Sequence, residues 1–328
     1  MIITKILDVK KNKELSIDLA IESINRGFPV AFPTETVYGL GAPIFNIDTI
    51  RKIFEIKQRD LGNPLTAHIS NLNDVDFLCK DIPDDFYKLS EKFLPGPLAI
   101  ILHKKNEINN IISGNQSTLS IRFPANSFFL EFANIIGQPF AATSANLSGR
   151  PSPNCAEVVL DDLNGKIEYI LDTGKCDYSI ESTVISLVGE NPILVRPGVI
   201  SKDDIEKVIG KKLDIEVNSI TLYNSNFSAI RNSCCKVINS EIVQDVNLYI
   251  SFSTSKRILV LAPESLIDTI ESNYKIILNI GTLFDSLRYA EKNYFDEVIV
   301  LFDKFVKDYE ILNHRLKYSQ KLTLDNNG

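Results

Sequence analysis

The most constraining feature of this sequence is an alternation of short apolar runs and amphipathic helical stretches that continues through most of the chain. It is interrupted once, from residue 214 to 245, where Asn, Ser and isolated apolar residues follow no clear period. Alternating strands and helices favour the α/β fold class, in which a sheet carries helices on its faces. We therefore expect a larger α/β domain over 1–213, a linker over 214–245, and a small α/β domain over 246–328 with a parallel, Rossmann-like sheet.

Hydrophobic periodicity and Gly or Pro stops place the individual elements. In the larger domain they predict helices at 13–26, 47–56, 84–93, 127–136 and 202–209, and strands at 29–32, 65–70, 98–102, 118–123, 139–142, 169–171, 184–188 and 193–195. After the linker they predict strands at 247–252, 257–261, 275–280 and 297–302, and helices at 264–272, 283–292 and 309–322.

Composition argues against several classes of protein. The 328 residues include 5 cysteines without C-x-x-C spacing and 3 widely separated histidines, so neither a disulfide framework nor a zinc site is expected. The net charge of -7 argues against a protein that mainly coats nucleic acid. No apolar run is long enough to cross a membrane, and residues 1–13 lack the apolar core of a signal peptide, so we expect a cytoplasmic protein.

An apolar strand ends in an unusually polar turn within residues 31–42. The segment combines two threonines, a carboxylate, a tyrosine and two glycines directly after its apolar start. Hydroxyls and a carboxylate at the mouth of a buried strand, with glycines where backbone must approach closely, indicate a turn that binds a small molecule. A polar turn without a ligand is the alternative.

Further polar residues gather where other predicted strands begin or end. Lys57 and Arg59 lie on a Gly/Pro-containing loop before the strand that carries His68, where solvated charge and a core histidine are the alternatives to ligand contacts. Arg122 needs an anionic partner, which is either a structural carboxylate or a ligand. The loop at 143–154, rich in hydroxyls and amides, suits an anion or a nucleotide, or is a polar surface loop.

The common catalytic motifs are missing. The sequence has no P-loop, G-x-G-x-x-G turn, H-E-x-x-H, G-x-S-x-G or EF-hand loop, and no recognisable pairing of a nucleophile with a base. What remains is a set of cations and hydroxyls at strand ends. Such a site holds anions and stabilises charge at a phosphoryl centre, which favours a nucleoside triphosphate together with a small carboxylate-bearing molecule.

Eight segments of the first domain resemble, in order, the motifs of the YrdC-type family, the threonylcarbamoyl-AMP synthases. They are Pro33-Thr34-Glu35-Thr36-Val37-Tyr38-Gly39-Leu40-Gly41, Lys57-Gln58-Arg59, Asn63-Pro64-Leu65, Pro95-Gly96-Pro97, Arg122-Phe123-Pro124, Ser144-Ala145-Asn146-Leu147-Ser148-Gly149, Glu181-Ser182-Thr183-Val184 and Arg196-Pro197-Gly198. The resemblance covers about residues 15–210, and the βαβα tail resembles the two-domain branch. It implies a YrdC-like twisted mixed sheet with flanking helices.

The resemblance also implies an activity, that of an L-threonylcarbamoyladenylate synthase. Members of the family are nucleotidyltransferases that convert L-threonine, bicarbonate and ATP, with Mg2+, into L-threonylcarbamoyl-AMP and pyrophosphate. The product feeds the N6-threonylcarbamoyladenosine modification of tRNA through downstream threonylcarbamoyl-transfer proteins. Direct binding of tRNA is left open, and no metal ligand is expected from the chain itself.

The same resemblance assigns site residues position by position. Lys57 and Arg59 match the K-x-R cations and are the expected catalytic residues. The positions that match the L-threonine side are Thr36, His68, Arg122, Ser144 and Ser182. The positions that match the ATP side are Arg59, Asn63, Thr118, Asn146, Asn154 and Arg196.

The sequence departs from the family pattern at four places. Asp60-Leu61 replaces the proline after the K-x-R, Ala99 replaces a threonine, and Asn154 stands where serine or threonine is usual. Two-domain members also carry S-P-G-x-x-x-x-H-Y between the domains, with a tyrosine that folds over the nucleotide, whereas residues 214–257 contain neither Pro-Gly nor His-Tyr. Two alternatives stay open: a catalytically impaired member that only binds nucleotide or RNA, and an enzyme that hands carbamoyl-AMP to an attached transferase, which 246–328 is too small to supply.

Overall fold

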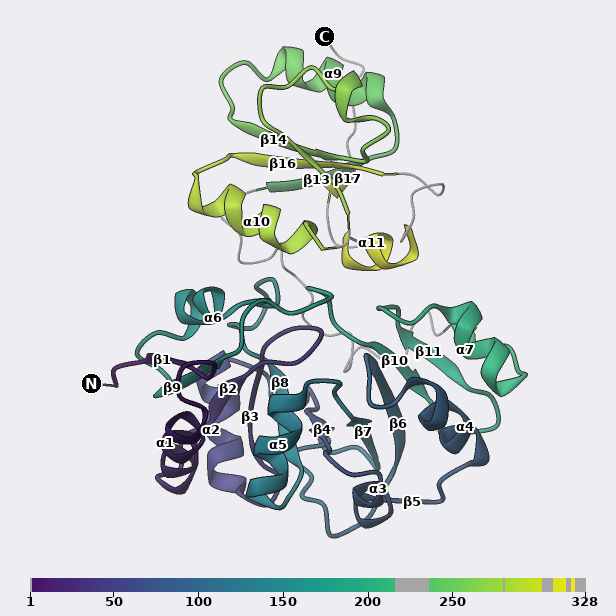
Figure 1. Ribbon diagram of the computed structural model, residues 1–328. Helices are drawn as coiled ribbons and strands as arrows, with labels where there is room; N and C mark the ends of the chain where they lie inside the picture. The colour runs from purple at the N-terminus through teal and green to yellow at the C-terminus, as the bar shows by residue number, and fades with distance from the viewer. Residues whose placement is uncertain (1, 216–235, 280, 303–308, 317–319, 322–328) are drawn as a thin grey trace. The chain divides into compact units, whose positions relative to one another are not determined.

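The computed structural model describes residues 2–215, 236–279, 281–302, 309–316 and 320–321, coloured along the chain in Figure 1. By its contacts the chain divides into two units, one holding residues 1–148 and 152–225, the other holding residues 149–151 and 226–328. The second unit thus takes in three residues of the predicted loop at 143–154. Inside this unit, the Arg150 guanidinium pairs with Glu291 at 2.6 Å.

The first unit is built on one mixed sheet, with strands in the order β1-β9-β2-β3-β8-β4-β7-β6-β10-β11-β12 and with β5 beside β6. The strands are β1 (Lys5–Asp8), β2 (Val30–Phe32), β3 (Gly39–Pro43), β4 (Thr66–His68), β5 (Cys79–Lys80), β6 (Leu98–Lys104), β7 (Thr118–Arg122), β8 (Phe140–Ser144), β9 (Tyr169–Asp172), β10 (Thr183–Ser186), β11 (Ile193–Arg196) and β12 (Asp214–Ile215). Parallel pairs such as β4–β7 occur beside antiparallel pairs such as β6–β7. The expected mixed α/β sheet is confirmed.

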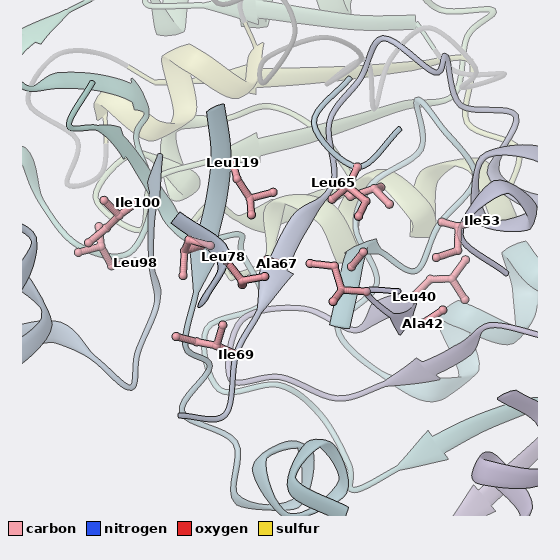
Figure 2. Packing of buried hydrophobic residues seen from close by; sticks show 14 of the residues in the cluster. Leu40, Ala42, Ile53, Leu65, Ala67, Ile69, Leu78, Leu98, Ile100 and Leu119 are labelled. Atoms are coloured by element: carbon pink, nitrogen blue, oxygen red, sulfur yellow. The ribbon is translucent and has the colours of Figure 1, made fainter. Parts of the chain in front are cut away.

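Helices pack on both faces of this sheet. They are α1 (Lys13–Asn25), α2 (Ile47–Lys57), α3 (Asn73–Leu78), α4 (Asp84–Phe93), α5 (Ser127–Ile136), α6 (Ala156–Leu163) and α7 (Lys202–Ile209). In β2, Val30 and Phe32 face a cluster formed with α1 and α5, whereas Ala31 between them faces a second cluster formed with α2 and α6. Figure 2 shows part of this second cluster, around Leu40 and Ile53. Because both faces are apolar, polar side chains can converge at strand ends and in the connecting loops.

Capping residues explain where the helices begin and end. Asn126 and Ser201 accept the amide hydrogens of the third residues of α5 and α7 through their side chains. At the other ends, Gly137 and Gly210 adopt positive φ of 75° and 69°, a conformation that ends a helix and that glycine adopts without strain. The predicted bounds of these two helices are confirmed.

The second unit has a parallel sheet of its own, with strands in the order β15-β14-β16-β13-β17. Its elements are β13 (Lys236–Ser240), α9 (Val243–Phe252), β14 (Ile258–Ala262), a short 3-10 turn η1 (Ile267–Thr269), β15 (Lys275–Ile277), α10 (Leu283–Lys292), β16 (Glu297–Leu301), α11 (Tyr309–Leu316) and β17 (Gln320–Lys321). Val246 of α9 belongs to one apolar cluster and Leu287 of α10 to another. The expected small α/β domain with a parallel sheet is confirmed.

The predicted strand at 247–252 is wrong, because these residues complete helix α9. Alternating apolar residues suggested a strand. The side chains that pack on the sheet, Val243, Val246 and Ile250, instead recur at helical spacing.

Other differences also fall after residue 213. The predicted helix at 264–272 is wrong over most of its length, since only η1 is helical there. The predicted linker at 214–245 is bounded by strands at both ends: β12 pairs with β11, and β13 lies between β16 and β17. Residues 216–235 of that linker lie outside the described residues. No helix in the described part of the chain is long and apolar enough to span a bilayer.

Candidate active site

The polar turn after β2 is locked by one of its own hydroxyls. Thr34 Oγ1 accepts the amide hydrogen of Val37 at 3.2 Å and donates to its carbonyl at 2.6 Å. The hydroxyls of Thr34 and Thr36 lie 3.0 Å apart. The turn is followed by Gly39, where a larger residue would not fit because a β-carbon would lie 2.7 Å from the Phe32 ring. The turn is therefore buried and held in shape by hydrogen bonds of its own.

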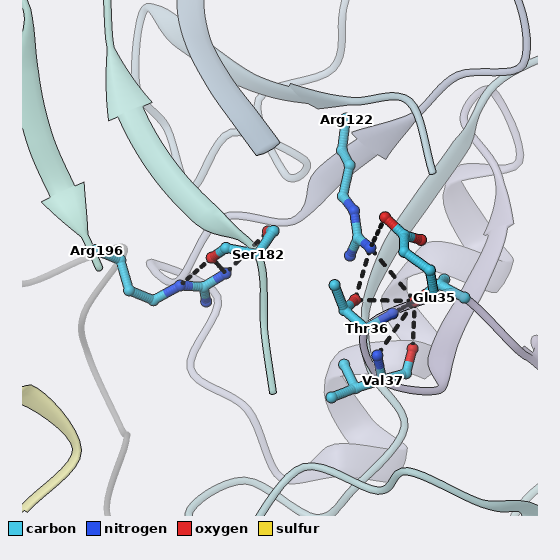
Figure 3. A network of polar contacts seen from close by, with 7 residues as sticks. Glu35, Thr36, Val37, Arg122, Ser182 and Arg196 are labelled. Carbon is cyan, nitrogen blue, oxygen red and sulfur yellow. Dashed lines mark hydrogen bonds and ion pairs between the residues drawn. The ribbon is translucent and has the colours of Figure 1, made fainter. Parts of the chain in front are cut away.

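Arg122, the last residue of β7, extends its guanidinium to this turn (Figure 3). Its Nη2 donates to Thr36 Oγ1 at 2.6 Å and, more weakly, to Thr34 Oγ1 at 3.4 Å. The same nitrogen lies 3.0 Å from Glu35 Oε1, and the Arg122 and Glu35 residues are only 5% and 3% exposed. Of the two anionic partners that the sequence left open for Arg122, the structure provides a carboxylate of the protein.

His68, the last residue of β4, is the registered neighbour of Arg122. Its ring lies edge-on to Phe32 and Phe129, with centroids 6.0 Å apart in both cases. Burial and the nearby Arg122 charge lower the pKa of His68 to about 3, so the ring is neutral at physiological pH. Its Nδ1 lies 3.2 Å from the Thr66 carbonyl, which can only accept, so Nδ1 carries the proton and Nε2 is left as an acceptor.

A second arginine, Arg196, lies at the end of the row of registered residues that contains Arg122. Registered pairs run from His68 through Arg122, Ala99 and Val184 to Arg196, across strands β4, β7, β6, β10 and β11. Arg196 donates to the Ser182 carbonyl from Nε and Nη2, at 3.1 and 2.8 Å (Figure 3). Ala99, which replaces a threonine of the family pattern, lies in the middle of this row and is buried.

Lys57 and the loop after β8 form another cluster. The Lys57 side chain is buried at the end of α2, and its Nζ donates to the carbonyls of Ser144 and of Asn146, the latter at 2.5 Å. Burial, reinforced by the charge of Arg59, lowers the pKa of Lys57 well below its ordinary value. The arrangement holds the loop that begins at Ser144 against the end of α2.

Arg59 is anchored two residues further on. Its Nη2 donates to the Pro64 carbonyl at 2.9 Å, and its Nε to the Asn63 carbonyl at 3.3 Å. Burial lowers the pKa of Arg59 to about 10, which leaves the guanidinium charged at neutral pH. A fixed, half-buried cation of this kind is suited to an anionic ligand such as a phosphate.

Two predicted site residues take other positions. Thr118 begins β7, four residues before Arg122, and its hydroxyl donates to Gln116 Oε1 at 3.2 Å. Asn154 donates from Nδ2 to Ser179 Oγ at 3.1 Å.

The structure therefore groups the predicted residues in four sets. It brings Thr36 and His68 to Arg122, Lys57 to Ser144 and Asn146, Arg59 to Asn63, and Ser182 to Arg196. The first set lies wholly on the predicted threonine side, whereas Arg196 of the predicted ATP side contacts Ser182 of the predicted threonine side. The assignment to threonine or ATP stays a prediction.

Glu35 is the site residue that sequence reasoning missed. The sequence showed a carboxylate between two threonines at the mouth of a strand, without a partner for it. In the structure its side chain faces Arg122. The feature that could have indicated this pairing was the apolar strand before the turn. A carboxylate buried beside such a strand needs a cation, and Arg122 on another apolar strand needs an anion.

The arrangement suits binding and charge stabilisation rather than covalent catalysis. Arg122, Arg196 and Arg59 supply guanidinium groups at fixed positions, and the threonine and serine hydroxyls add neutral donors and acceptors. The described residues contain no group of three or more His, Cys, Asp or Glu side chains that could hold a metal ion.

Comparison with known proteins identifies the architecture. The Sua5–YciO–YrdC family model, described as telomere recombination, matches residues 22–198. Threonylcarbamoyl-AMP synthase of Pyrococcus abyssi is 42% identical over 209 residues, and that of Bacillus subtilis is 44% identical over 182 residues. These alignments cover 63% and 55% of this chain but only 62% and 53% of the relatives' own length.

Solved structures resemble the chain over both units. P. abyssi Sua5 complexed with L-threonine gives a TM-score of 0.85 at 30% identity, covering 98% of this chain and 100% of that one. A double variant of P. abyssi Sua5 gives 0.86 at 31% identity, covering 97% and 98%.

Proposed function

The chain belongs to the Sua5–YciO–YrdC family, and we propose that it is an L-threonylcarbamoyladenylate synthase, a nucleotidyltransferase that acts on L-threonine, bicarbonate and ATP. The observation that carries the proposal is the buried Arg122 guanidinium, held by the hydroxyls of the turn after β2. The names of the similar proteins, and the L-threonine bound to one of them, support the same substrate.

We assign the threonine side to the turn and to the ends of β4 and β7. Arg122 pairs with the substrate carboxylate, because a guanidinium fork matches a carboxylate in charge and shape. Thr36, Ser144 and Ser182 supply hydroxyl contacts, and neutral His68 offers Nε2 as an acceptor for the threonine hydroxyl. A neutral imidazole is required there, since an imidazolium beside Arg122 would add an unpaired positive charge to a buried site.

We assign the ATP side to Arg59, Asn63, Thr118, Asn146, Asn154 and Arg196. Arg59 and Arg196 offset the triphosphate charge, and the amide and hydroxyl groups contact the nucleotide. Lys57 contributes by fixing the loop at 144–146 through its two bonds to backbone carbonyls, which keeps Ser144 and Asn146 in place.

The chemistry then needs no protein nucleophile. The threonine amine and bicarbonate give a carbamate with loss of water, and a carbamate oxygen attacks the α-phosphate of ATP while pyrophosphate leaves. Rate comes from holding the two substrates in line and from the cations that stabilise the charge of the phosphoryl transition state. Arginines held by hydrogen bonds to the protein serve this purpose because their charge is fixed in position before the reaction begins.

Mg2+ enters the proposal with ATP. The described residues offer no dedicated carboxylate cage, and Mg2+ is commonly held by substrate phosphates together with one or two protein ligands and water. When bound it would neutralise part of the triphosphate charge, which adds to what the arginines do.

Release of pyrophosphate by the purified chain tests the proposal. We expect release that requires L-threonine, bicarbonate and ATP together, and no release when any one is omitted. Binding of ATP without release over a range of Mg2+ concentrations would favour the impaired, binding-only alternative. Turnover of carbamoyl phosphate would favour the carbamoyl-adenylate alternative.

The product of this reaction would be consumed by downstream proteins that transfer the threonylcarbamoyl group to tRNA. The chain's own contact with tRNA and its cytoplasmic location stay predictions from the sequence.

A further inference from the structure

The Glu35–Arg122 pair has hydrogen-bonding capacity that the protein does not use. Within the described part of the chain, three buried atoms of this pair have no hydrogen-bond partner. They are the two carboxylate oxygens of Glu35 and the Nε of Arg122. Buried polar atoms without partners are rare in native proteins and call for an explanation. Here the three atoms belong to two side chains that face each other in one site (Figure 3).

The contact between the two side chains balances charge without satisfying these atoms. Nη2 of Arg122 lies 3.0 Å from Glu35 Oε1, but its hydrogen bonds go to the hydroxyls of Thr36 and Thr34. Glu35 therefore keeps two acceptors and Arg122 keeps a donor. A ligand that satisfies both must present a donor, preferably cationic, and an acceptor, preferably anionic.

The neighbouring titratable groups do not alter this balance. Burial raises the pKa of the Cys176 thiol to about 12 and burial lowers that of His68 to about 3, so both are neutral near pH 7. A simple carboxylate bound to Arg122 would leave two negative charges against one positive charge in a buried site. A zwitterion preserves neutrality.

We infer that Glu35 is a specificity-determining residue: it binds the α-ammonium group of the amino-acid substrate, while Arg122 binds its carboxylate. The inference rests on the proposed function, which supplies the amino acid, and it adds the group that separates an amino acid from the corresponding hydroxy acid. Glu35 selects by charge, because the hydroxyl of a hydroxy acid offers one neutral hydrogen bond where an ammonium offers a charged one.

Calorimetric titration of the full chain with two ligands tests this assignment. The ligands are L-threonine and 2,3-dihydroxybutanoate, in which a hydroxyl replaces the amino group. We expect the wild type to bind threonine at least about ten-fold more tightly, the loss typical of a charged hydrogen bond. We expect Glu35→Gln to lose most of that preference, because it weakens threonine binding and, by removing one of two negative charges, strengthens binding of the hydroxy acid.

Glu206→Gln is the matched control. Glu206 is likewise a buried glutamate of the first unit, but it pairs with Lys212 and the Leu213 amide at the end of α7. This variant should keep the wild-type preference for threonine. A second variant, Glu35→Asp, retains the charge and should keep more of the preference than Glu35→Gln.

The outcomes separate this inference from the proposed function. A wild type that binds neither threonine nor ATP overturns both. A wild type that makes threonylcarbamoyl-AMP but binds the two ligands equally overturns only the role of Glu35, and this comparison needs no variant to fold. The same conclusion follows if Glu35→Gln retains the wild-type preference or weakens both ligands equally.

Discussion

Single residues in this site carry charge where water is largely excluded, and the arrangement is stable only because opposite charges face each other. Arg122 and Glu35 are both nearly fully buried, 3.0 Å apart at their closest atoms. Breaking such a pair by removing one partner is far more costly than replacing both, because the remaining charge is left unpaired.

We therefore expect Arg122→Met to lower the free energy of unfolding by about 3–5 kcal/mol, since it leaves the Glu35 carboxylate buried without a cation. The double variant Arg122→Met with Glu35→Gln should recover a substantial part of this loss. Urea denaturation of the wild type, both single variants and the double variant measures the coupling. Strictly additive effects would contradict a direct pairing of the two charges.

His68 gives a second prediction at this scale, on pH. Its pKa is about 3 in the folded protein, whereas an unfolded histidine titrates near 6.5, so the unfolded chain binds more protons between these values. The contribution of neutral His68 is thus present above pH 6.5 and is lost as the pH falls.

The stability difference between wild type and His68→Gln should accordingly shrink by about 1.4 kcal/mol per pH unit below about pH 6.5. Denaturant unfolding of both proteins at several values between neutral and mildly acidic pH measures it. Parallel stability curves would show that His68 is not buried as a neutral ring.

At the scale of elements, backbone close approach determines which residues the loops can carry. Gly198 follows β11, and a β-carbon there would lie 2.7 Å from the Glu181 carbonyl oxygen and 2.5 Å from the Ser182 carbonyl carbon. These are backbone atoms of the segment that accepts the Arg196 hydrogen bonds.

Gly198→Ala should therefore push the 181–183 backbone away from Arg196, destabilise the fold by about 1–3 kcal/mol and weaken substrate binding. Gly281→Ala is the control, because the nearest atom to its β-carbon would be Asn279 Oδ1 at 3.4 Å. Thermal unfolding and threonine titration of both variants measure the effect. Equal behaviour of the two variants would contradict the close approach.

Local signals predicted elements well where capping and periodicity agreed. α5, with a side-chain cap at Asn126 and Gly137 after its last turn, has the predicted bounds of 127–136. α9 was missed because a short window showed alternation at 247–252, whereas its packing residues begin at Val243, inside the expected linker. A period of two and a period of 3.6 cannot be separated over six residues when the start of the element is unknown.

At the scale of the whole molecule, the sequence predicted candidate site residues better than it predicted the contacts between them. Eight motifs in order predicted the family and the mixed sheet. The contact of Glu35 with Arg122 joins residues 87 positions apart, one in the turn after β2 and the other at the end of β7, and these two strands are not adjacent in the sheet. Such pairings depend on strand order, which periodicity does not specify.

The same limit applies to the second unit. Its parallel sheet was predictable, but the place of β13 between β16 and β17 was not, because that strand lay in the expected linker.

The most direct test of the proposed reaction follows the carbon of bicarbonate. The purified chain, given L-threonine, ATP, Mg2+ and 13C-labelled bicarbonate, should form an AMP adduct of threonine that carries the label in its carbamoyl carbon, as read by mass spectrometry. Omitting threonine should abolish the labelled adduct. Formation of pyrophosphate without a labelled threonine adduct, or no adduct at all, would contradict the account.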